Sequence, residues 1–240
     1  MTPFSLSVFF PCYNEEENVE RVVRDALGVL PECCDEFEII IVDDGSTDRT
    51  GELADRLAAA HEPVRAVHNR PNRGYGGALR RGFAEARKNW IFYTDGDGQF
   101  DLAELKRLIP LLRDYDIVSA YRIDRQDPWI RKLNAFGWST LVNLLFSLGV
   151  RDIDCAFKIF PRTLFEQIEL KSNSALIDTE VLARAKRLGY RIGQIGVRHL
   201  PRTAGVQTGA NPRVILRAFC ELLQLRKDIL RTQPRPAPVE

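Results

Sequence analysis

The sequence has few of the features that mark disulfide-stabilised, zinc-binding or nucleic-acid-binding proteins. Its five cysteines are an odd number, include the adjacent pair Cys33 and Cys34, and show no C-x-x-C spacing. A disulfide framework or a zinc site is therefore not expected. The cysteine pattern instead favours a reducing, cytosolic compartment. With 34 basic and 33 acidic side chains, the net charge of +1 gives no reason to expect a nucleic-acid partner. The first residues have no basic segment ahead of an apolar one, so no signal peptide is expected.

Three ligand-binding fingerprints are also missing. No G-x-G-x-x-G follows the first apolar run, Leu6–Phe10, and no G-x-x-x-x-G-K-[ST] occurs in the chain. These absences exclude the dinucleotide fingerprint and the P-loop. Counted from Asp95, the sixth and twelfth positions are Phe100 and Lys106, which excludes an EF-hand loop.

What the chain does contain is a strict alternation of short apolar runs and helical patterns. Strands are predicted at Leu6–Phe10, Phe37–Val42, Val64–His68, Trp90–Thr94 and Ile117–Tyr121, and helices at Glu15–Leu30, Asp48–His61, Gly76–Lys88 and Ala103–Leu112. This order predicts an α/β fold with a mainly parallel, Rossmann-like sheet covered by helices on both faces. In such sheets ligands bind at the carboxyl ends of the strands.

Polar clusters follow three of the predicted strands and should converge on one crevice. They are Pro11–Glu17, Asp43–Asp48 and Asp95–Gln99. Asp95 and Asp97 would repel each other at the end of a buried strand unless positive charge lies nearby. An acidic crevice of this kind suits Mg²⁺ or Mn²⁺ shared with a diphosphate, and Gly96 and Gly98 would let the backbone turn and a bulky ligand approach. The alternative is an ordinary Asp- and Gly-rich turn at a strand end.

Six segments, in this order along the chain, carry a resemblance to a known family. They are FFPCYNEEENV, EIIIVDDGSTDRT, NRPNRGYGGALRRGF, YTDGDGQFD, DIDCAFKIFPR and RHLPRTAG, and they span roughly residues 4 to 220. The chain resembles the family 2 glycosyltransferases with the GT-A fold, and within them the dolichol-phosphate mannosyltransferase and polyprenyl-phosphate glycosyltransferase group. The resemblance implies a metal-dependent, inverting transfer of a hexose from a nucleotide-diphospho-sugar, either a GDP- or a UDP-sugar.

The resemblance implies a nucleoside pocket at the ends of the first two predicted strands. Pro11, Tyr13 and Glu15 would line this pocket, with Tyr13 against the base or ribose, and Asp44 would accept hydrogen bonds from the base. For Asp43 and Asp44 the alternative role is capping of the following helix.

The resemblance also implies a cation site, in the DxD motif of Asp95 and Asp97. Asp95 would contact the ribose or sugar, and Asp97 with Gln99 would hold the Mg²⁺ or Mn²⁺ that bridges the diphosphate. Close helix packing is the favoured reason for Gly74, Gly76 and Gly77, ahead of a phosphate cradle.

The acceptor half of the chain combines basic residues with an uncharged helix. Basic side chains gather at Arg122, Arg131, Lys132, Arg151, Lys158, Arg198 and Arg202, of which the resemblance singles out Arg122, Arg131 and Arg202 as ligands of phosphate groups. The uncharged stretch Leu133–Val150 is too short and too polar for a confident membrane span. It is interpreted either as an amphipathic helix that contacts the membrane surface or as an ordinary buried helix. In the resembling group a helix here lies against the membrane.

Whether the reaction needs a protein base depends on the acceptor. A lipid monophosphate is already an anion and can attack directly, whereas a hydroxyl must lose its proton to a carboxylate. The candidate bases are Asp152, Asp154, Asp178 and Glu180, and the sequence does not choose among them. Asp178 has helix capping as its alternative role.

The domain interpretation is one GT-A domain over residues 1–232, followed by a disordered tail at 233–240. Residues 1–122 would bind the nucleotide-sugar and residues 123–232 would form the acceptor half. A C-terminal helix at Pro212–Arg231 could bind a membrane surface, form a homodimer contact or pack on the domain. Ala156 and the pair Val206-Gln207 depart from the family pattern, and the second departure weakens the case for a lipid-phosphate acceptor.

The predicted activity is hexose transfer to a polyprenyl or dolichyl phosphate by a cytoplasmic enzyme, peripheral on the inner face of the membrane. The first alternative keeps the donor chemistry and uses a hydroxyl acceptor on a glycan, glycolipid or small molecule. The second is an inactive nucleotide-sugar-binding scaffold. A nucleotidyltransferase would share the carboxylates and the cation but release pyrophosphate.

Overall fold

A computed structural model describes the backbone of residues 4–123, 129–201 and 212–231, and the side chains of residues 4–123, 137–201 and 221–231. The predicted phosphate ligands Arg131 and Arg202 have side chains outside these ranges, as do Lys132 and the pair Val206-Gln207. The predicted tail at 233–240 also lies outside the described residues.

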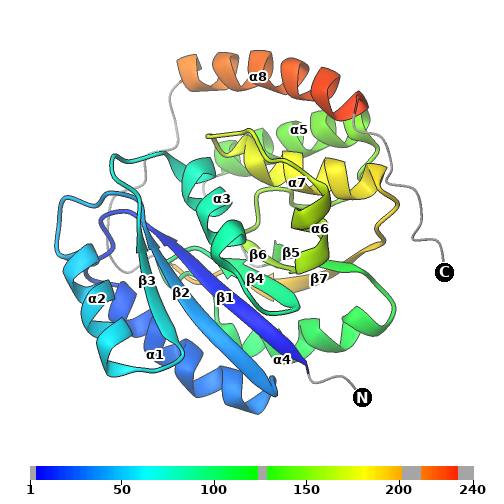
Figure 1. Ribbon diagram of the computed structural model, residues 1–240. Helices are drawn as coiled ribbons and strands as arrows, with labels where there is room; N and C mark the ends of the chain where they lie inside the picture. The colour runs from blue at the N-terminus through cyan, green and yellow to red at the C-terminus, as the bar shows by residue number, and fades with distance from the viewer. Residues whose placement is uncertain (1–3, 124–128, 202–211, 232–240) are drawn as a thin grey trace.

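Seven strands form one mostly parallel sheet, as the sequence predicts (Figure 1). They are β1 (Ser5–Cys12), β2 (Glu36–Asp43), β3 (Val64–His68), β4 (Trp90–Thr94), β5 (Ile117–Ile123), β6 (Phe157–Pro161) and β7 (Ile192–Arg198), in the order β3-β2-β1-β4-β6-β5-β7. Only β6 runs antiparallel to its neighbours β4 and β5. Because of this reversal, the start of β6 lies at the same sheet edge as the carboxyl ends of the other strands.

Helices cover both faces of the sheet (Figure 1). The eight α-helices of the described residues are α1 (Val19–Val29), α2 (Thr50–Ala60), α3 (Tyr75–Glu85), α4 (Leu105–Leu108), α5 (Trp129–Phe146), α6 (Arg162–Gln167), α7 (Leu176–Arg187) and α8 (Pro212–Leu230). The apolar residues of α1, α2 and α4 pack on one face, and those of α3, α6 and α7 pack on the other. Side chains along β1 alternate accordingly, since Leu6, Val8 and Phe10 join the first layer and Phe9 joins the second.

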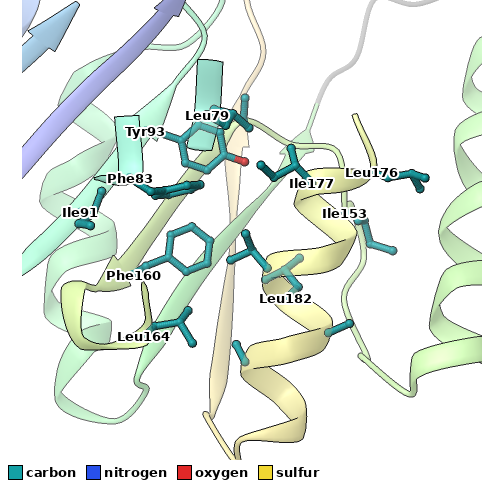
Figure 2. Packing of buried hydrophobic residues seen from close by; sticks show 14 of the residues in the cluster. Leu79, Phe83, Ile91, Tyr93, Ile153, Phe160, Leu164, Leu176, Ile177 and Leu182 are labelled. Atoms are coloured by element: carbon teal, nitrogen blue, oxygen red, sulfur yellow. The ribbon is translucent and has the colours of Figure 1, made fainter. Parts of the chain in front are cut away.

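The second layer is built around aromatic rings. Phe83 of α3 stacks on Phe165 with ring centroids 4.0 Å apart and meets Tyr93 of β4 edge-on at 5.7 Å. Figure 2 shows Phe83 and Tyr93 on the side of the sheet that faces α7, with the Tyr93 hydroxyl pointing toward the first turn of that helix near Ile177. This packing places the end of β4 against the start of α7.

Two predicted helices differ from the observed ones. The helix predicted at Ala103–Leu112 is split into a 3₁₀ turn (Leu102–Glu104), α4 and a second 3₁₀ turn (Ile109–Arg113), because Pro110 cannot donate a backbone hydrogen bond. The helix predicted at Glu15–Leu30 begins only at Val19, after a turn in which Glu15 O accepts from the backbone N–H groups of Asn18 and Val19.

Helix α8 lies beside α7 at one end of the molecule (Figure 1), and Arg226 of α8 donates to Leu145 O of α5 at 3.4 Å. The uncharged stretch predicted as a helix at Leu133–Val150 is helical from Trp129 to Phe146 and buries Val142, while Leu144 is 80% exposed. Leu222, Leu225 and Ile229 of α8 are buried in the core, which favours packing on the domain for this part of the helix. Among the described helices, none has the length and apolar character needed to cross a bilayer.

Gly76, in the first turn of α3, meets the loop 171–174 at very close range. A Cβ added to Gly76 would lie 2.6 Å from the Asn173 carbonyl carbon and the Ser172 carbonyl oxygen. This confirms the interpretation of helix packing for Gly76. The approach allows the Gly76 N–H to donate to Asn173 O at 3.1 Å.

We expect Gly76→Ala to lower the free energy of unfolding by about 1–3 kcal/mol, because backbone atoms cannot move aside as a side chain can. Gly28→Ala is the matched control, since Gly28 also lies in a helix but a Cβ there would meet no atom within 4 Å. Helix propensity alone should then raise stability by about 0.5–1 kcal/mol. Urea unfolding measures both values, and equal effects of the two substitutions would contradict the close packing at Gly76.

Candidate functional site

The three polar clusters meet at the carboxyl edge of the sheet. Backbone hydrogen bonds join them directly, since Asp44 N donates to Cys12 O at 2.9 Å and Gly96 N donates to Pro11 O at 3.3 Å. Side chains add to this, because Ser46 Oγ accepts from Asn14 N at 3.0 Å. The three clusters that the sequence predicts to converge therefore form one hydrogen-bonded unit.

The loop after β1 presents Tyr13 at the surface of this unit. Its side chain is 51% exposed, whereas Pro11 and Glu15 on either side are half-buried. Asn14 has a φ of 56°, a left-handed conformation, and its Oδ1 accepts from Thr47 N at 2.8 Å. Glu15 N donates to Thr50 Oγ1 at 2.8 Å, which ties the loop to the start of α2.

Asp43 and Asp44 are both buried but have different partners. Asp43 accepts from Ser46 N at 2.9 Å and lies 2.9 Å from His68 Nδ1. Burial raises the pKa of Asp43, but these hydrogen bonds outweigh it and the net pKa is lowered. Asp44 Oδ1 accepts from Asn69 Nδ2 at 2.8 Å and from Arg73 N at 3.0 Å. Neither accepts from a backbone N–H of α2, whereas Asp48 Oδ1 accepts from Thr50 N, the first residue of that helix, at 2.9 Å.

The acidic loop Asp95–Gln99, which follows β4, contacts both α1 and the end of β1. Asp97 is 8% exposed, and its Oδ1 accepts from Gln99 N at 3.0 Å. Arg21 of α1 donates to the carbonyl oxygens of Asp97 at 3.3 Å and Gly98 at 3.4 Å. Gly98 has a φ of 69°, so the predicted turn is observed there. At Gly96 a Cβ would lie 2.5 Å from Cys12 Sγ, so this glycine allows close approach to β1 itself.

Asp95 lies beside Asp97 at the end of β4. Its Oδ1 accepts from the Tyr75 hydroxyl at 3.0 Å. Burial, and then the charge of Asp97, raise the pKa of Asp95 to about 7. A carboxylate whose ionisation is disfavoured by a neighbouring negative charge forms a site where a bound cation would be stabilised.

The residues at this loop fit a hard divalent cation. Asp95, Asp97 and Gln99 supply the oxygen ligands that Mg²⁺ and Mn²⁺ prefer. Gln99 Nε2 donates to Leu200 O at 3.1 Å, so its amide is oriented by the segment after β7. Among the described residues, no group of three His, Cys, Asp or Glu side chains is arranged to hold a metal. Further ligands would therefore come from the amide or from a bound diphosphate.

A buried cation lies beneath the acidic loop. Lys158 of β6 is fully buried, and its Nζ donates to Asp178 Oδ1 and Cys155 O, both at 2.6 Å, and to the Tyr93 hydroxyl at 3.0 Å. The Tyr93 hydroxyl in turn donates to Asp178. Lys158 was grouped with the acceptor-side cations on sequence grounds. That grouping is wrong, because its three donors are all used inside the protein.

Arg122 and Asp152 form a bidentate pair behind the site. Arg122 Nε and Nη2 donate to the two Asp152 oxygens at 2.7 and 2.8 Å, and Arg122 N donates to the same carboxylate at 3.2 Å. Burial lowers the pKa of Arg122, but the Asp152 carboxylate more than offsets this and the net pKa is raised. A carboxylate with three N–H donors is a weak base, so this geometry does not suit the role predicted for Asp152.

Glu180 is also unsuited to the base role that the sequence allows. It is 0% exposed and accepts from Lys171 N, Ser172 N and the Arg184 guanidinium at 2.8–3.2 Å. Glu180 therefore folds the loop 171–174 onto α7. Asp178 is likewise engaged, by Lys158.

Comparison with known proteins decides the family. The family model described as "Glycosyl transferase family 2" matches residues 7–169. The chain belongs to glycosyl transferase family 2. This glycosyltransferase is 35% identical over 209 residues to "Glycosyltransferase AglD" of Haloferax volcanii, a match that covers 82% of the chain but only 33% of that protein.

Other relatives of this family 2 glycosyltransferase have names that specify a lipid phosphate. It is 28% identical to "Dolichyl-phosphate beta-glucosyltransferase" of Dictyostelium discoideum, over 96% of the chain and 74% of that protein. It is 30% identical to "Polyprenol monophosphomannose synthase" of Mycolicibacterium smegmatis, over 86% of the chain and 82% of that protein. The resemblance to the polyprenyl-phosphate glycosyltransferase group is thereby confirmed.

The GT-A fold of the glycosyltransferase is confirmed by solved structures. Glucosyl-3-phosphoglycerate synthase from Mycobacterium tuberculosis, in complex with Mn²⁺ and UDP-glucose, superposes with a TM-score of 0.71. The match covers 98% of this chain and 82% of that one at 21% identity, so it supports the fold alone.

Sequence reasoning gave no role in this glycosyltransferase to Arg21 or Tyr75, and it assigned Lys158 to the wrong group. Arg21 has the appearance of an ordinary surface residue on a helix, and no sequence signal distinguishes it. Tyr75 lies in the N-R-G-Y-G-G segment but carries no pattern that points to Asp95. The sequence does contain a signal for the burial of Lys158. It interrupts the apolar run Phe157–Phe160, and a charged side chain in a buried strand needs a buried partner.

Proposed function

We propose that the protein moves a hexose from a GDP- or UDP-sugar to a polyprenyl or dolichyl phosphate at the cytoplasmic membrane surface. The observation that carries the proposal is the convergence of the acidic loop Asp95–Gln99 with the ends of β1 and β2. The names of the Dictyostelium and Mycolicibacterium relatives support the acceptor class.

On the donor side, Tyr13 would pack against the base or ribose, because its ring is exposed on a loop fixed by Asn14. Pro11 and Glu15 would complete the pocket, and Asp44 would accept from the base. Asp95 would contact the ribose or sugar. Asp95, Asp97 and Gln99 would hold Mg²⁺ or Mn²⁺, which supplies positive charge to the diphosphate when bound.

On the acceptor side, Arg122 would contact a phosphate with the donors that Asp152 does not use, and Arg131 and Arg202 are proposed to assist. A phosphate oxygen of the acceptor attacks the anomeric carbon as the bond to the donor diphosphate breaks. The nucleoside diphosphate leaves with that electron pair, and attack opposite to it inverts the configuration. No proton is transferred, so no protein base is required.

A hydroxyl acceptor is the second candidate, and one observation favours it. Asp154 is a half-buried carboxylate that accepts no hydrogen bond within the described part of the chain. A hydroxyl acceptor would need such a group to take its proton.

A panel of nucleotide-sugars tests the donor half of the proposal. We expect one donor to be consumed slowly without acceptor, with release of nucleoside diphosphate, in the presence of Mn²⁺ or Mg²⁺ and not in excess chelator. The assay quantifies nucleoside diphosphate and pyrophosphate separately. Release of pyrophosphate would indicate a nucleotidyltransferase, and binding of a donor without any turnover would indicate a scaffold.

A further inference from the structure

We propose that Asp154 binds hydroxyl groups of the transferred sugar and so selects which nucleotide-sugars the enzyme accepts. This inference rests on the proposed function, because it adds a specificity residue to the donor site. It is carried by one juxtaposition: a carboxylate without a hydrogen bond among the described residues precedes β6, at the sheet edge where Asp95 follows β4.

The first step is that Asp154 differs from the neighbouring carboxylates. Asp152 is held by Arg122, Asp178 by Lys158, and Glu180 by Arg184. Within the described residues Asp154 accepts no hydrogen bond and forms no ion pair. A half-buried carboxylate that accepts no hydrogen bond from the described residues has all its acceptor positions available to a ligand.

The second step is the position of Asp154. In the antiparallel pair of β4 and β6, Thr94 lies opposite Phe157. The segment that precedes Phe157 therefore runs beside the segment that follows Thr94, which contains Asp95. The Tyr75 hydroxyl donates to Asp95, and the negative charge of Asp154 contributes to raising its pKa. Asp154 thus belongs to the side of the crevice where Asp95 would meet the sugar.

The third step is the kind of ligand that this carboxylate can bind. A carboxylate only accepts hydrogen bonds, so its ligand must offer donors. An ionised carboxylate repels a phosphate oxygen, and the nearby cations Lys158 and Arg122 are already paired with Asp178 and Asp152. Burial, and then the charge of Asp178, raise the pKa of Asp154 to about 6, which leaves it mostly ionised at neutral pH. The neutral hydroxyls of a hexose fit these demands, and a sugar that carries its own carboxylate does not.

The test compares two ligands that differ only in the sugar. Calorimetry measures the affinity of the wild-type protein, Asp154→Asn and Asp154→Ala for UDP against UDP-glucose and for GDP against GDP-mannose, with Mn²⁺ present. For the pair that the wild type binds, we expect Asp154→Ala to weaken the nucleotide-sugar about tenfold to a hundredfold, the range for a lost hydrogen bond to a charged group. The nucleotide-sugar affinity of Asp154→Asn should lie between those of the wild type and Asp154→Ala. The affinity for the nucleoside diphosphate should change less than about twofold in either variant. Asp25→Asn, an exposed carboxylate on α1, is the matched control and should change neither affinity.

Each other outcome overturns the inference in a distinct way. Equal weakening of both ligands would assign Asp154 to the nucleotide pocket or the fold. Unchanged nucleotide-sugar affinity with loss of transfer to a hydroxyl acceptor would make Asp154 the base instead. Unchanged affinity and transfer would leave it without a role in the donor site. If the wild type bound none of these ligands, the proposed function itself would fail first, and the inference would fail with it.

Discussion

Asp97→Asn is expected to lower sugar transfer by at least about a hundredfold, the loss typical when one group that stabilises transition-state charge is removed. The substitution removes a negative charge that is 8% exposed and leaves the loop in place. Asparagine Oδ1 can still accept from Gln99 N, and Arg21 still holds the carbonyl of residue 97. Mn²⁺ affinity, measured by electron paramagnetic resonance, should fall together with the transfer rate.

Asp101→Asn is the matched control for this substitution. Asp101 lies four residues further on, is exposed, and caps a 3₁₀ turn by accepting from Ala103 N at 2.9 Å. Asparagine caps equally well, so stability and transfer should stay close to those of the wild type. Wild-type rates in Asp97→Asn, or full activity in excess chelator, would contradict the cation role of Asp97.

Lys158→Met is expected to lower the free energy of unfolding by about 3–5 kcal/mol, because it leaves the buried Asp178 carboxylate without its cation. Lys158 is 0% exposed and its ammonium makes three hydrogen bonds, so no water can replace it without opening the core. For a chain of this size the melting temperature should fall on the order of 10 °C. Urea and thermal unfolding measure these changes.

Two further variants distinguish the effect of breaking the buried Lys158–Asp178 pair from the effect of removing a lysine charge anywhere in the protein. Lys171→Met removes a lysine that is 56% exposed and lies 3.9 Å from Asp228, and should cost less than about 1 kcal/mol. The double variant Lys158→Met with Asp178→Leu should recover part of the loss, because a buried pair replaced by apolar groups is often tolerated. A single Lys158→Met variant as stable as the wild type would contradict the buried network.

The parts of the fold set by local pattern could be predicted from the sequence. Strands such as β1 and β4 are continuous apolar runs, and the following polar clusters mark their ends, so the crevice follows from a parallel sheet. The antiparallel direction of β6 could not be predicted this way. It depends on pairing with β4 and β5, which are remote in sequence, and Lys158 breaks its apolar pattern.

The candidate site also has one part that the local sequence predicts and another that depends on tertiary contacts. The positions of Asp95, Asp97 and Gln99 follow from their place after β4, whereas the choice of partners depends on tertiary contacts. Asp152, Asp154, Asp178 and Glu180 are equivalent candidates in the sequence. Only the folded chain shows which of them are engaged, because their partners lie up to 85 residues away. Arg21 contacts Asp97 across 76 residues, which no local pattern can reveal.

The most direct test of the proposed function follows the sugar itself. The wild-type protein is incubated with its nucleotide-sugar, labelled in the hexose, together with Mn²⁺, a polyprenyl phosphate and a soluble sugar acceptor. The predicted result is label in the lipid extract as a polyprenyl-phosphate sugar, with one nucleoside diphosphate released for each sugar transferred. Label in the soluble sugar, with none in the lipid phosphate, would contradict the account.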